Sequence, residues 1–113
     1  MKTGIETIIN KCCVLWGFDK NVVMGKSRIQ PIPRIKAMIA YTIRDTFRLP
    51  LKKISDILGC NHTTIIYYLK MYDSEYKYNQ EFRNFAIAMK GVSSDIRTEF
   101  QEELEEELNE IIG

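Results

Sequence analysis

The chain of 113 residues has room for one domain built around one hydrophobic core. Hydrophobic residues make up 45% and charged residues 27%, a composition typical of a soluble globular protein. No apolar run approaches the roughly 20 residues needed to cross a bilayer, and the first residues do not form a secretory signal. The three cysteines are an odd number and give no disulfide framework. We therefore expect a cytoplasmic protein that does not contact membranes.

Charge is distributed unevenly along the chain. Residues 1–90 hold 15 basic and 7 acidic side chains, a net charge of +8. Residues 91–113 hold one arginine and eight acids, a net charge of −7. Within the basic part, residues 20–53 carry nine basic side chains against Asp45 alone. A basic body of this kind predicts a polyanionic partner and the acidic tail a separate element, although a basic surface can also be merely solvated.

The first third of the chain predicts two helices and a basic loop. Thr3-Gly4-Ile5-Glu6 has capping-box spacing, so we expect a helix from Gly4 that stops at Gly17. Asp19 is suited to cap a short helix through Met24. Gly25–Pro33 contains one glycine, two prolines and two cations, which is typical of a loop. Pro33 fits the first position of the following helix, expected over Arg34–Phe47.

Two consecutive helices are predicted next, joined by a tight turn. Pro50 precedes an expected helix over Leu51–Leu58, and Gly59 is suited to end it in a left-handed conformation. Asn61 can then cap a helix from His62 to about Met71. This helix is expected to bury Ile65, Ile66 and Leu69.

The C-terminal part predicts two more helices. One carries Phe82, Phe85, Ala86 and Met89 and is expected to end near Gly91. Ser93 or Ser94 is then expected to cap the last helix, which has an apolar stripe of Ile96, Phe100, Leu104, Leu108 and Ile111 or Ile112 among glutamates. The predicted fold is all-α: a small domain with a central helix-turn-helix over residues 1–91, followed by an acidic amphipathic helix over residues 92–113.

A helix-turn-helix can place its second helix in the major groove of DNA. The first residues of that helix must then be small and polar, so that they approach the bases and offer both donors and acceptors. His62, Thr63 and Thr64 meet this requirement, and a threonine methyl can also pack on the thymine methyl. The alternative is an ordinary polar start of a structural helix.

The amino-acid sequence of this segment resembles that of a known family. Leu51-x-x-Ile54-Ser55-Asp56-x-Leu58-Gly59-Cys60-Asn61-His62-Thr63-Thr64-Ile65 is similar to the C-terminal DNA-binding domain of the bacterial replication initiator DnaA, in which Asp-His-Thr-Thr-Val opens the recognition helix. Lys26-Ser27-Arg28 stands where that family has a basic loop, and Pro33-Arg34-Ile35-Lys36-Ala37-Met38 resembles the start of its long helix. The resemblance covers about residues 22–72.

The resemblance implies a Trp-repressor-like domain that reads a short duplex box in replication or transcription control. Arg28 would enter the minor groove, while Asn61, His62, Thr63 and Thr64 would read base edges in the major groove. Phosphates would be held by Lys26, Arg34, Lys52 and Lys53. Asn61 replaces the aspartate of the family, so an amide suited to adenine replaces a carboxylate suited to cytosine.

Other chemistries are not supported by the spacing. Gly25-Lys26-Ser27 copies the end of a phosphate-binding loop, but the glycine required five residues earlier is Lys20. The spacing of Cys12, Cys13, Cys60 and His62 matches no familiar structural zinc site. His62 is the only histidine, and no set of nucleophile and base is apparent. We therefore expect neither an enzyme nor a bound cofactor or metal.

The acidic tail leaves three interpretations open. Its apolar stripe can dock on its own domain, pair with a second copy, or bind another protein. Five glutamates between residues 102 and 107 repel one another, so an isolated helix would be weakened and a covering surface is expected. A tail of this charge could also shield the basic loop. The alternative to DNA binding is accordingly a small helical module that binds proteins.

Overall fold

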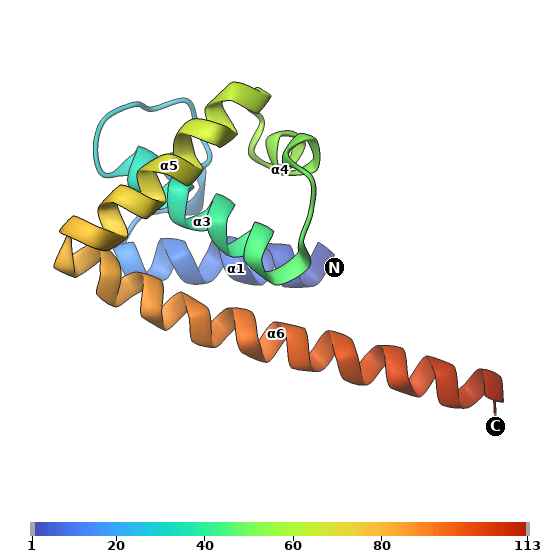
Figure 1. Ribbon diagram of the computed structural model, residues 1–113. Coiled ribbons are helices and arrows are strands. Elements are labelled where there is room, and N and C mark those ends of the chain that lie inside the picture. Colours follow the sequence, from blue (N-terminus) through green and yellow to red (C-terminus); the bar gives the residue numbers. More distant parts are fainter. Residues whose placement is uncertain (1, 113) are drawn as a thin grey trace.

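The computed structural model describes residues 2–112, and these form six helices joined by loops and turns (Figure 1). The fold is all-α, as the sequence predicts. The helices are α1 (Lys2–Trp16), α2 (Lys20–Val23), α3 (Ile32–Phe47), α4 (Leu51–Leu58), α5 (His62–Tyr78) and α6 (Gln80–Ile112).

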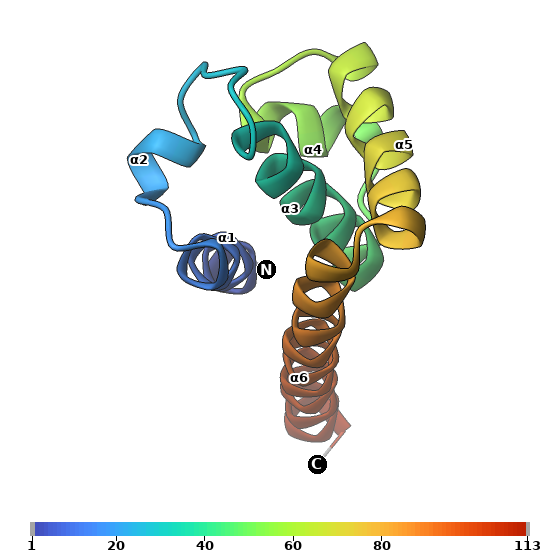
Figure 2. The same ribbon diagram turned by 90° about the vertical axis from the view of Figure 1, so that its left-hand side faces the viewer.

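Helix α3 is the centre of the molecule, because it contacts each of the other five helices. Its sequence permits this position: Ile35, Met38, Ile39 and Ile43 are fully buried, and so is Ala37 on the neighbouring face. A helix that is apolar on several faces is normally enclosed by others. Among its neighbours are α1 and α6 on one side and α5 on another (Figure 2).

Aromatic side chains join α5 and α6 to this core. The rings of Tyr41 and Tyr72 stack with their centroids 3.7 Å apart. Trp16 meets Phe82 and Phe85 edge-on, with centroids 6.0 and 4.9 Å away. These contacts fix the direction of α5 relative to α3 and hold the start of α6 against the end of α1.

The expected helix break near Gly91 is wrong. Helix α6 continues through Gly91, and neither Ser93 nor Ser94 begins a new helix. Glycine inside a helix costs only about 1 kcal/mol relative to alanine. Buried Met89 before it and buried Ser93 and Ile96 after it pack on the same body, so the helix is held on both sides of the glycine. One helix therefore crosses the expected boundary between residues 91 and 92.

Two polar contacts fasten the middle of α6 to α3. The hydroxyls of Thr46 and Ser93 are buried and lie 2.6 Å apart. Arg97 donates from Nη2 to Oδ2 of Asp45 over 2.8 Å. Beyond Glu103, which still lines a cleft with α1, helix α6 projects past the N-terminal end of α1 (Figure 1).

The bounds of three helices also differ from the expected ones. Helix α1 begins at Lys2 and includes Thr3, while α3 begins at Ile32 and places Pro33 within its first turn. Helix α5 runs to Tyr78, well past Met71, because Tyr72 is buried against α3 and α6. Ile66, expected in the core, is exposed.

Candidate nucleic-acid interface

The start of α5 is fixed by the side chain of Asn61. Its backbone is extended, and its Oδ1 accepts hydrogen bonds from the Thr64 amide over 2.8 Å and from the Thr64 hydroxyl over 3.0 Å. This confirms the predicted cap. It also shows that the polar groups of Asn61 and Thr64 already pair with each other, whereas the exposed side chains of His62 and Thr63 make no protein hydrogen bond of their own within the described residues.

The turn before α5 has the geometry that its glycine predicts. Gly59 adopts a left-handed conformation with φ of 66°, and the amide of Cys60 donates to the carbonyl of Ser55 over 3.0 Å. Ile54, Leu58 and Ile65 are buried and pack α4 against α5 and the core. The two helices and their turn therefore form a rigid base that leaves the first turn of α5 facing solvent.

The loop between α2 and α3 is tied to the body by Lys36. This lysine is buried on α3, and its Nζ donates to the carbonyl of Gly25. Burial lowers the pKa of Lys36 below its usual value. Within the loop, Oγ of Ser27 accepts from the amide of Ile29 over 3.2 Å. The loop thus lies at the same end of the molecule as the turn before α5 (Figure 2).

An open groove of about 530 Å³ lies between this loop and the first turns of α5. Four of the side chains that the sequence singles out line it together: Arg28 from the loop, Asn61 from the turn that caps α5, and Thr63 and Thr64 from α5. Burial raises the pKa of Tyr68 on the groove floor, and the charge of nearby Arg28 opposes this rise. The groove therefore combines one exposed cation with hydroxyl and amide groups that can donate and accept.

The remaining predicted residues lie outside this groove. His62 and Lys26 are exposed close by in sequence but are not part of its lining, and Lys52 is exposed on α4. Lys53 is also exposed on α4 and lines a different groove, beside α1 and α2. Arg34 donates from Nε to Oε1 of Glu75 over 3.0 Å, which joins α3 to α5. Its guanidinium is therefore already engaged by a carboxylate.

The groove also contains residues that were not assigned to base reading from the sequence. Tyr67 is 56% exposed and lies one helical turn after Thr63, a spacing that indicates a shared face. Gln30 lines the groove two residues after Arg28 and offers an amide with donors and an acceptor. Nothing in the local pattern singles out Gln30, because its position depends on how the loop folds onto α5.

No protein-family model matches the sequence, and a search of curated proteins finds no match. Among the described helices, none is long and apolar enough to cross a membrane. Within residues 2–112, no three His, Cys, Asp or Glu side chains are grouped in a way that could hold a metal ion. The interpretation of the groove therefore rests on its own residues and their arrangement.

Proposed function

We propose that the chain binds double-stranded DNA in a sequence-specific manner through a DnaA-like helix-turn-helix, in replication or transcription control. The observation that carries the proposal is the groove in which Arg28 from a distant loop meets Asn61, Thr63 and Thr64 at the start of α5. Solvent-facing polar side chains in the first turn of the second helix are what base reading in a major groove requires.

Arg28 and α5 have complementary tasks in this proposal. The first turn of α5 enters the major groove, where Thr63 and His62 meet base edges. Arg28 lies across the intervening DNA phosphate backbone from α5 and enters the adjacent minor groove. A narrow minor groove has an enhanced negative potential, which attracts the guanidinium. Lys26 and Lys52 lie exposed on the loop and on α4 and hold phosphates. Because Arg34 is paired with Glu75, its contribution to phosphate binding requires that this ion pair rearrange.

Selection of bound duplexes from a random pool, followed by titration of one selected and one scrambled duplex, tests the proposal. Thr63→Val keeps the shape of the side chain and removes its hydroxyl. We expect the preference for the selected duplex to fall by roughly 1–3 kcal/mol, since this is the usual value of a specific base contact. Thr98→Val makes the same change on the exposed part of α6 and serves as the matched control.

The outcomes distinguish sequence-specific base recognition from non-specific binding to the DNA backbone. If Thr63→Val weakens selected and scrambled duplexes equally, α5 binds DNA without reading it at this position. If no duplex is retained at moderate salt, the proposed function is wrong. The groove would then be a surface for another class of partner.

A further inference from the structure

Two surfaces of the molecule have no partner within the described chain. The first, which we call the C-terminal stripe, is the apolar face of α6 beyond the body. It consists of Leu104, Leu108 and Ile111, which are 40, 55 and 82% exposed, whereas Phe100 still lines the cleft between α6 and α1. By helical periodicity Glu107 and Glu110 run along one edge of this stripe. The stripe is therefore apolar with an acidic border.

The second surface, which we call the basic groove, lies between α1, α2 and α4 and has a volume of about 730 Å³. Its walls are apolar and its rim carries three lysines. The lining residues are Ile5, Ile9, Met24, Leu49 and Ile57, with Lys2, Lys20, Lys53 and Glu6. An apolar groove with a net positive rim fits an apolar ligand with a negative border.

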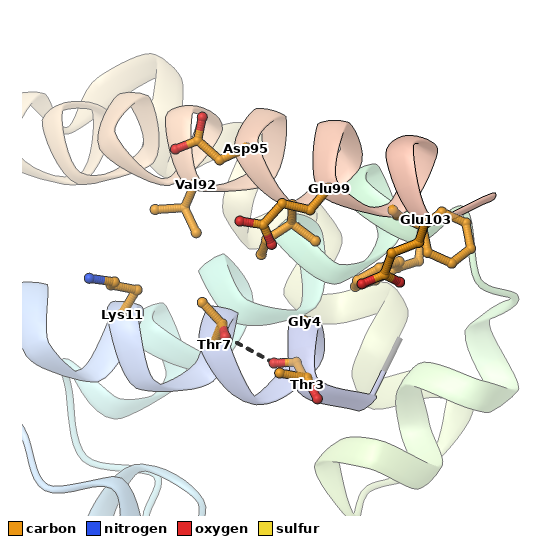
Figure 3. Close-up of a pocket in the computed structure, with 11 residues that line it drawn as sticks. Thr3, Gly4, Thr7, Lys11, Val92, Asp95, Glu99 and Glu103 are labelled. Atoms are coloured by element: carbon orange, nitrogen blue, oxygen red, sulfur yellow. Dashed lines mark hydrogen bonds between the residues drawn. The ribbon is translucent and has the colours of Figure 1, made fainter. Parts of the chain in front are cut away.

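The two surfaces of one chain lie on opposite sides of α1. Gly4, Thr7 and Lys11 recur at helical spacing and face α6, as Figure 3 shows. A Cβ on Gly4 would lie 2.7 Å from Cζ of Phe47, so this face of α1 packs closely on the body. Ile5 and Ile9 lie on the other face of α1 and line the basic groove. The tail of a continuous α6 therefore cannot reach the basic groove of its own chain.

Glu107 and Glu110 at the border of the stripe form no ion pair within the described residues. In the cleft between α1 and α6, the carboxylates of Glu99 and Glu103 point toward α1 (Figure 3), and Lys11 is the one basic residue of that lining. Two tails packed against each other would bring together two segments of charge −7, which is unfavourable. A basic partner surface is required, and the basic groove provides one.

We propose that the chain forms a dimer in which the C-terminal stripe of each copy occupies the basic groove of the other. Leu104 and Leu108 pack against the apolar walls, and the glutamates at the border of the stripe approach Lys2 and Lys20. The exchange is reciprocal, so the contact closes after two copies. The stripe and these two lysines lie outside the groove beside α5, so the dimer contact is separate from the proposed base-reading surface. Lys53 is the one proposed phosphate ligand that also lines the basic groove.

Sedimentation equilibrium over a concentration series tests this assembly. We expect a reversible change from 13.2 kDa to twice this mass, weakened by added salt. Leu104→Asp should remove the association, and the double variant Lys2→Glu, Lys20→Glu should weaken it by about tenfold or more through like-charge contacts. Val14→Asp is the matched control, since Val14 is 76% exposed on α1 and lies outside the basic groove. Circular dichroism confirms that each variant keeps its helices.

Mixing the two disabled proteins gives the decisive result. The Leu104→Asp chain retains an intact groove, and the Lys2→Glu, Lys20→Glu chain retains an intact stripe. Their mixture should therefore associate where each alone is monomeric. A wild-type chain that stays monomeric at every concentration would overturn the proposal. So would a groove variant that associates as the wild type does while Leu104→Asp dissociates, because the tails would then pair with each other.

Discussion

Replacement of Asn61 separates the stability of α5 from its proposed reading of DNA. Asn61→Ala removes the acceptor of two hydrogen bonds, from the amide and the hydroxyl of Thr64. Loss of an N-cap of this kind costs about 1 kcal/mol. In a domain of this size such a loss lowers the melting temperature by roughly 4–8 °C. Asn61→Asp keeps an acceptor at the same place and adds a negative charge that the helix N-terminus favours, so its melting temperature should not fall.

The same two variants differ in their expected effect on DNA. Asn61→Ala should weaken binding to the selected duplex, whereas Asn61→Asp should shift the preferred base at one position from adenine to cytosine. Thermal melting followed by circular dichroism gives the stabilities, and duplex selection with each variant gives the preferences. An unchanged melting temperature for Asn61→Ala would refute the capping argument. An unchanged selected sequence for Asn61→Asp would show that the side chain of residue 61 does not read a base.

Three further changes test the electrostatic and packing arguments. Replacing Lys52 and Lys53 together by alanine should weaken all duplexes alike and flatten the log–log salt dependence by about 0.9 per lost phosphate contact; an unchanged slope would remove both lysines from the interface. Lys36→Met keeps the buried aliphatic part of the side chain but removes its hydrogen bond to the Gly25 carbonyl, so we expect faster amide hydrogen exchange in the loop and weaker duplex binding without loss of helix. Unchanged amide exchange would show that this hydrogen bond does not hold the loop. Burial raises the pKa of Tyr72, so the folded state keeps the phenol proton at a pH where the unfolded state loses it, and the free energy of unfolding should decline as pH rises above about 10. Tyr72→Phe should reduce this decline when melting is measured over a pH series. An equal decline in the variant would assign it to other titratable groups.

Much of the helix-turn-helix is predictable because its signals are local. Gly59 predicts the end of α4 because glycine readily adopts the left-handed conformation found there. Asn61 predicts the start of α5 because its side chain accepts from the amide of Thr64, only three positions away. The bounds of α4 follow from Pro50 and Gly59 in the same way. The fold class was predictable too, since the apolar residues recur at helical spacing throughout.

The features that could not be predicted depend on contacts between distant segments. The sequence predicts Arg34 as a phosphate ligand, but the ion pair of Arg34 with Glu75 joins residues 41 positions apart, so no local pattern indicates it. Gly91 predicts a helix end because the cost of glycine in a helix is visible in the sequence, whereas the packing of Met89 and Ile96 that offsets this cost is not. The shared groove of Arg28 and α5 could not be predicted, because the path of a loop with two prolines is set by tertiary contacts such as that of Lys36.

The central claim is that duplex DNA is bound by Arg28 and the first turn of α5, which line the same groove of the protein. Titrating the isotope-labelled chain with its selected duplex, and following each backbone amide by NMR, tests this claim most directly. We expect the largest shift changes in residues 26–30 and 61–68, with small changes in α1 and in the projecting part of α6. Changes that are confined to α6, or that are equal for selected and scrambled duplexes, would contradict the claim.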